Sequence, residues 1–247
     1  MSLRAVSALL LLAAPLPAQT VDEIVGRYVA ARGGLERIRS IQSMRLSGTI
    51  SPAPGESGPF RLELKRPQRM RVEMIVQGMT LTQATNGTTA WVVTPMLVGG
   101  AGVILPREEA QGLKDQADLE GPLVDWKAKG HRVELTGRDK RFGPEAFRLK
   151  VQLRSGDVRW LYIDATSYLQ IAEEGERPSP RGLVRIETRL SDHRDVQGLI
   201  VPFVLDISAG GDDRQRVAFE RVEVNPPLED ARFEAPAGAK APPAPPR

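Results

Sequence analysis

Two residue types that carry much of protein chemistry are absent or scarce, because the chain has no cysteine and only two histidines. Without cysteine there can be no disulfide, thiol nucleophile, cysteine-based metal site or lipid-anchored cysteine. His131 and His193 have no neighbours at metal-ligand spacing, so we expect neither a metal nor another cofactor. Ser191 and Asp192 precede His193, but adjacent residues of a strand point to opposite faces and cannot form a hydrolase triad. We therefore expect a protein that is not an enzyme.

An excess of charge and long apolar runs are also absent. With 34 Lys and Arg against 31 Asp and Glu, the chain is too balanced to favour nucleic acid or an anionic membrane as its main partner. The apolar run from Ala5 to Ala14 has about half the length needed to span a bilayer. It follows Arg4 and precedes small residues, which is typical of an export signal. We predict a signal peptide over residues 1–18, cleaved near Ala18, and a soluble periplasmic protein.

The domain organisation is expected to be simple. No internal segment is rich enough in Pro, Gly or Ser to separate two domains, and one large β domain commonly has about 200–250 residues. We predict a single domain over residues 19–235. Residues 236–247 have no large apolar side chain to bury, so we predict a disordered tail there.

Two segments have helical patterns. Thr20 to Glu23 is a capping box that opens an N-terminal helix, which Gly33 and Gly34 end before a second short helical turn from Leu35. Pro106 to Lys127 is the second helical segment, which Gly121 and Pro122 should break into two short helices. We expect this segment to act as a lid over a sheet, with these inward-facing residues: Leu113, Ala117 and Leu123.

Elsewhere the apolar residues alternate with polar ones, which predicts half-buried strands. The alternation is clearest from Phe60 to Lys65, from Met70 to Val76 and from Phe147 to Leu153. A turn at 155–157 then leads into a strand with Trp160. About eleven strands are too many for a flat sheet, so the fold class is mainly β: a strongly curved antiparallel sheet, or incomplete barrel, with helices over its concave face.

The apolar faces of these strands are the candidate ligand-binding surface. Periodicity alone does not tell whether they enclose a filled core or a hydrophobic cavity, although methionines suit adaptable binding surfaces. The expected cavity residues are Phe60, Leu62, Leu64, Met70, Val72, Met74, Trp91, Phe147, Leu149, Val151, Trp160 and Phe203.

Two polar clusters have other interpretations. Residues 99–102 are rich in glycine, but the strand and helix of a phosphate-binding loop are missing around them, so they are expected to be a flexible connection. Asp115, Asp118, Glu120 and Asp125 lie in the lid segment. Carboxylates can perform acid–base chemistry when they are buried in a cleft. On an amphipathic helix they more often form the solvated side, which is the interpretation that we favour.

Three segments, taken in order, are similar to a known family. Gly58 to Pro67 closes a strand on Lys65-Arg66-Pro67, Asn86 to Pro95 combines a turn with a strand tryptophan, and Asp230 to Gly238 has a phenylalanine before a Pro-Gly run. Together they resemble the periplasmic outer-membrane lipoprotein carriers, which have the LolA/LolB-like fold. The absence of cysteine disfavours the lipidated acceptor branch of that family.

The resemblance implies a function. In that family an incomplete barrel encloses a cavity for the acyl chains of lipoproteins in transit to the outer membrane. It implies a monomeric transport chaperone that binds lipoprotein acyl chains or another lipid, with an inner-membrane donor complex and an outer-membrane acceptor. It also implies that Arg66 bonds to the lid and holds it closed, although a plain charged strand end is the alternative. A non-catalytic sensor or scaffold of the same fold, which binds a protein partner, is the alternative function.

Overall fold

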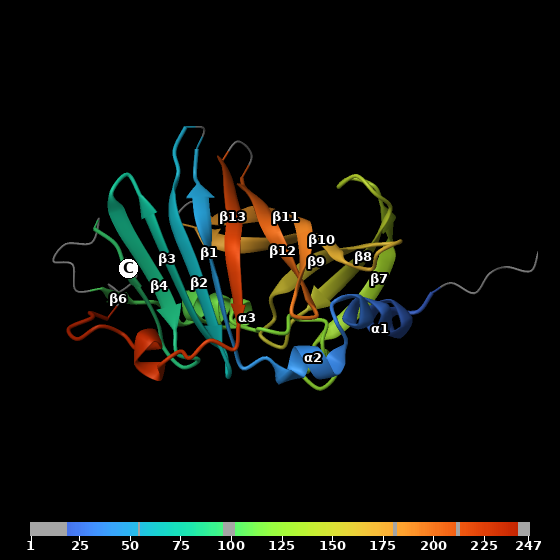
Figure 1. Cartoon of the computed structure of the whole chain (residues 1–247), viewed down its shortest axis with the longest axis horizontal. Coiled ribbons are helices and arrows are strands. Elements are labelled where there is room, and N and C mark those ends of the chain that lie inside the picture. Colours follow the sequence, from blue (N-terminus) through green and yellow to red (C-terminus); the bar gives the residue numbers. More distant parts are fainter. Residues whose placement is uncertain (1–18, 54, 96–101, 180–181, 211–212, 242–247) are drawn as a thin grey trace, which may run out of the picture.

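The computed structural model describes residues 19–53, 55–95, 102–179, 182–210 and 213–241. Its main element is one antiparallel sheet of 13 strands (Figure 1). The strands are β1 (Ser43–Ser51), β2 (Gly58–Lys65), β3 (Arg69–Val76), β4 (Met79–Thr85), β5 (Ala90–Val93), β6 (Val103–Ile104), β7 (Arg132–Asp139), β8 (Ala146–Gln152), β9 (Val158–Asp164), β10 (Gln170–Ser179), β11 (Gly182–Val196), β12 (Leu199–Ala209) and β13 (Asp213–Val224).

The strand order is that of two meanders joined at their ends. β1 to β6 follow one another on one side and β13 to β7 on the other, and β1 pairs with β13 between them. β6 and β7 are the two edges and do not pair with each other, so the sheet is curved but not closed. The prediction of a mainly β, incomplete barrel is confirmed, with 13 strands in place of about eleven.

Few helices accompany the sheet. They are α1 (Val21–Ala31), α2 (Leu35–Ser40), α3 (Arg107–Gln116) and the short 3-10 helix η1 (Asp230–Phe233). No helix in the described part of the chain is long and apolar enough to cross a membrane. The predicted signal peptide lies outside the described residues.

The N-terminal helix forms as its sequence predicts. The Thr20 hydroxyl accepts from the Glu23 amide at 3.3 Å, and the Glu23 carboxylate accepts from the Thr20 amide at 2.8 Å. Gly33 ends α1 with φ +116°, and a Cβ at that residue would lie 2.0 Å from the Gly198 carbonyl oxygen. The connection between α1 and α2 therefore requires glycine at residue 33.

The two faces of the sheet differ. The inner face is the one covered by α1 and residues 106–130, and the outer face is the other (Figure 1). Leu62 pairs with Val72 on the inner face, while their neighbours Arg61 and Glu73 pair on the outer face. This alternation follows from the period of two along a strand.

The segment after β13 crosses the outer face. We call residues 226–241 the C-terminal strap. Lys65 bonds to the Asp230 carboxylate at 2.7 Å, the Trp91 indole N–H donates to the Phe233 carbonyl at 3.0 Å, and Lys240 forms a parallel bridge with Val103 of β6. Residues 236–241, which belong to the predicted tail, include Lys240 with this backbone bridge to the sheet edge. Residues 242–247 lie outside the described residues.

A buried carboxylate joins the strap to the sheet. Glu63 of β2 is 1% exposed and accepts from Arg45 of β1 at 3.0 Å and from Arg232 of the strap at 2.8 Å. Burial alone would raise the pKa of Glu63, but the bonds from Arg232 and Arg45 outweigh it and hold the pKa below its ordinary value of 4.5.

We expect Glu63→Gln to lower the free energy of unfolding by about 2 kcal/mol at pH 7, because it removes the anion from a buried ionic cluster. The expected loss is below the ~3–5 kcal/mol of a fully buried pair, since both arginines reach solvent. Urea unfolding measures it, with Glu220→Gln, an exposed residue of β13, as the control.

The difference in unfolding free energy between the wild-type protein and Glu63→Gln should depend on pH, and its sign follows from the pKa of Glu63. A depressed folded-state pKa stabilises the protein above the ordinary pKa, and that stabilisation is lost as the pH falls through the folded-state pKa. The two unfolding curves should therefore converge below pH 4.5. A difference that stays constant from pH 7 to pH 3 would show that Glu63 acts through its shape and not its charge.

Candidate functional site: the inner face and its lid

Residues 106–130, here called the lid, lie on the apolar inner face between the two meanders. Ala110 and Leu113 of α3, together with Ala117 directly after it, pack against Met70 and Ala90. Further along, Leu123 and Val124 are both 0% exposed and belong to two different core clusters. The predicted lid residues Leu113, Ala117 and Leu123 all contact the inner face. Residues 122–130 form turns and not the predicted second helix.

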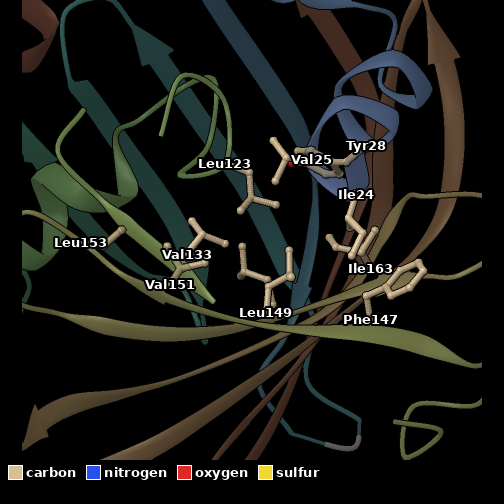
Figure 2. Close-up of a cluster of buried hydrophobic side chains, with 11 residues drawn as sticks. Ile24, Val25, Tyr28, Leu123, Val133, Phe147, Leu149, Val151, Leu153 and Ile163 are labelled. Atoms are coloured by element: carbon tan, nitrogen blue, oxygen red, sulfur yellow. The ribbon is translucent and has the colours of Figure 1, made fainter. Parts of the chain in front are cut away.

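The part of the inner face on β7 to β9 is a filled core. Phe147, Leu149 and Val151 are at most 2% exposed. Figure 2 shows them below α1 and Leu123, with Ile24 and Leu123 directed toward Leu149. These three predicted cavity residues therefore lie together, but in a region that the protein's own side chains occupy.

The part of the inner face on β1 to β3 and β12 to β13 is less completely covered. Met70 lies under α3 at 4% exposed, and Phe203 is 6% exposed in the neighbouring cluster. Other apolar residues around them are only partly buried, and we call this region the open half of the inner face. Its partly buried members among the predicted residues are Phe60, Leu62, Leu64, Val72 and Met74.

Two predicted cavity residues lie on the outer face instead. Trp160 pairs with Lys150, whereas Leu161 pairs with Leu149, so Trp160 and Leu149 point to opposite sides. Arg148 covers the Trp160 ring at 4.0 Å. The hairpin loop 153–157 has five residues, so the odd-numbered residues stay on the inner face from β8 into β9, and the even-numbered Trp160 lies on the outer face.

The predicted inward position of Trp91 is also wrong. Ala90 points inward next to Met70, so Trp91 points outward, where its indole N–H requires an acceptor and finds the Phe233 carbonyl. The ring also lines a surface groove of about 370 Å³ together with Arg71 and Arg232.

Arg66 joins three parts of the chain at the end of β2. Its guanidinium donates to the Ile41 carbonyl at 2.7 Å, to the Ile38 carbonyl at 3.4 Å and to the Glu120 carboxylate at 2.6 Å. The first two acceptors lie at the C-terminal end of α2 and the third lies in the lid. The planar fork of donors on arginine suits this arrangement, which an ammonium group cannot reproduce.

The other lid carboxylates also have partners. Asp118 bonds to Lys129 at 2.6 Å, Asp125 to Arg39 at 2.7 Å, and Asp115 accepts from the Ser155 hydroxyl at 2.7 Å. Glu120 is 7% exposed, so the expectation of a solvated acidic face is wrong for this residue. Its burial depends on Arg66, which is distant in sequence, and no local pattern could have revealed it.

The residues Ser191, Asp192 and His193 do not form a catalytic triad. Asp192 bonds to Arg194 at 2.5 Å and the His193 ring contacts the Gln170 carbonyl at 3.1 Å, so the two are engaged separately. Burial lowers the pKa of His193 below its ordinary value. No group of three metal-ligating side chains lies within the described residues. Of the glycine-rich segment 99–102, residues 99–101 lie outside them.

These features define a class of protein: an open, curved antiparallel sheet whose apolar face is covered by an N-terminal helix and a lid segment. Comparison with solved structures identifies the architecture as the LolA-like fold. No family model and no curated protein matches the sequence.

Three solved structures illustrate the likeness. A DUF1329 family protein from Desulfovibrio piger is 10% identical with a TM-score of 0.56, covering 87% of this chain and 97% of its own. A LolA superfamily protein from Nitrosomonas europaea is 14% identical with a TM-score of 0.54, covering 88% and 98%. An outer membrane lipoprotein-sorting protein domain from Vibrio parahaemolyticus is 11% identical with a TM-score of 0.51, covering 87% and 97%.

We expect Arg66→Leu to loosen the lid without unfolding the sheet. The variant leaves the buried Glu120 carboxylate without its guanidinium partner, and that loss costs about 1.5–3 kcal/mol even though the intact pair adds little net stability. Amide exchange in residues 118–130 should therefore accelerate at least about tenfold. Hydrogen–deuterium exchange measures this, and Arg61→Leu, which removes an exposed arginine 3.8 Å from Glu73 on the outer face, is the control. Unchanged exchange in 118–130, or equal acceleration in β8 and β9, would contradict a local fastening.

Proposed function

We propose that this protein is a non-catalytic periplasmic carrier that binds the acyl chains of lipoproteins, or another lipid, on the inner face of its sheet. The observation that carries the proposal is the open half of the inner face. Phe60, Met74 and Leu205 belong to one apolar cluster there, yet all three remain partly accessible. The architecture is shared with a protein whose name refers to lipoprotein sorting, which supports the same class of cargo.

The lid supplies a way to balance binding against release. Leu113, Leu123 and Val124 are at most 4% exposed, and each such side chain gains roughly 1.5–3 kcal/mol on burial. Their sum of roughly 5–9 kcal/mol corresponds to about six to eleven methylene groups at ~0.8 kcal/mol each. An acyl chain that displaces the lid therefore replaces a similar burial energy, which leaves binding reversible.

Arg66 has the role of a latch in this proposal. The ion pair of Arg66 with Glu120 has side chains 30% and 10% exposed. A partly buried pair of this kind specifies a geometry at small net gain in stability, because desolvation offsets much of the attraction. The latch therefore selects the closed position of the lid without making it too stable to open.

Adjacent residues of β3 offer a matched test of the binding surface. Met74 faces inward in the open half, whereas Ile75 is 38% exposed on the other side of the strand. Met74→Glu places a charge where an acyl chain would lie, and we expect it to weaken binding of a fluorescent fatty acid at least about tenfold. Ile75→Glu should leave binding unchanged. Thermal unfolding of both variants separates binding from folding.

The fully buried Leu149 cannot serve this purpose, because Leu149→Glu would disrupt a filled core. Equal binding by Met74→Glu and Ile75→Glu would place the lipid elsewhere. If the purified protein binds no lipid probe and carries no acyl species in native mass spectrometry, the carrier proposal fails. A scaffold that binds a protein partner would then be the better explanation.

A further inference from the structure

Two arginines lie on the mainly apolar inner face, on β9 and β10. Leu161 pairs with Glu173 on this face, and the same alternation places Arg159 and Arg177 on it. Arg177 also pairs across β11 with Val184. A charged side chain among apolar residues usually has a partner of opposite charge, so the surroundings of each arginine matter.

The charge of Arg159 is balanced by carboxylates of the protein itself. It lies 3.2 Å from the Asp157 carboxylate and 3.4 Å from that of Glu173, and its side chain is 12% exposed. Gly175, the residue beside it on β10, has no side chain, and a Cβ there would contact Arg159 Cγ at 3.9 Å. The charge of Arg159 is therefore neutralised and its stem is packed.

Arg177 lacks a carboxylate partner of this kind within the described residues. Within the described part of the chain it forms no hydrogen bond or ion pair, although water reaches its side chain. Surrounding protein atoms and the positive charge of Arg159 lower the pKa of Arg177, and the carboxylates of Glu173 and Asp157 oppose this only in part. An unpaired guanidinium next to the apolar residues Val184 and Ile186 is suited to an anion attached to an apolar chain.

We propose that Arg177 binds the anionic headgroup of an amphiphilic ligand whose chain lies along the inner face. A guanidinium presents two parallel N–H donors to the oxygens of a carboxylate or a phosphate, so a fatty acid and a phospholipid are both suitable sources. This inference rests on the proposed carrier function and deepens it, since it names the chemical class of the ligand.

Probes with one chain and different headgroups test the proposal. Dodecanoate, dodecyl phosphate and dodecanol share a twelve-carbon chain, and calorimetric titration at constant pH and salt gives their affinities. We expect one or both anions to bind the wild-type protein at least about tenfold more tightly than dodecanol, which is the magnitude of a charge-assisted hydrogen bond. The preferred anion shows whether the source is a carboxylate or a phosphate.

Variants assign the preference to one residue. Arg177→Gln should bind all three probes with the affinity of dodecanol, while Arg189→Gln, which removes an exposed arginine from β11, should keep the wild-type preference. Equal affinity of the wild-type protein for all three probes would overturn the headgroup site and leave the carrier function intact. A preference that survives in Arg177→Gln would overturn it too, and failure of every probe to bind would overturn both.

Discussion

The inner face of the sheet is mainly apolar in both meanders, and the need to cover it governs the rest of the structure. α1 and Leu123 cover the part on β7 to β9 so completely that Leu149 is 0% exposed. α3 and Val124 cover part of the remainder and leave the open half partly accessible. Burial of apolar area is the dominant favourable term in folding, so any cover that leaves must be replaced by another apolar group. A lipid chain is such a group, and lid and lipid thus compete for one surface.

The polar contacts decide where the lid lies and contribute little to how firmly it is held. Arg66, Lys129 and Arg39 bond to three different carboxylates of the lid, and none of these pairs is fully buried. Partly exposed ion pairs contribute about 0–1 kcal/mol each. The apolar contacts therefore supply the free energy that closes the lid, while the ion pairs determine the position in which the lid lies. The strap adds a separate fastening on the outer face, where it also pairs with the short edge strand β6.

Local patterns were sufficient to predict much of this fold. The capping box at Thr20, the glycines that end α1 and the inward parity of Phe60 and Met74 depend on neighbours in sequence, and the structure confirms all three. Trp91 and Trp160 were placed wrongly, because the face of a strand depends on its pairing register and on the length of the preceding loop. The burial of Glu120 and the surroundings of Arg177 depend on segments that are distant in sequence, so local patterns could not predict them.

The competition between lid and lipid can be tested by fixing the lid in place. Asp115 of α3 and Ser155 of the β8–β9 turn are in direct contact at 2.7 Å, and the chain has no cysteine of its own. Asp115→Cys combined with Ser155→Cys, joined by a short reducible thiol crosslinker, would hold α3 against the sheet. If lid and lipid compete for one surface, the linked protein should lose uptake of a fluorescent fatty acid, and reduction should restore it. Undiminished uptake by the linked protein would contradict this competition.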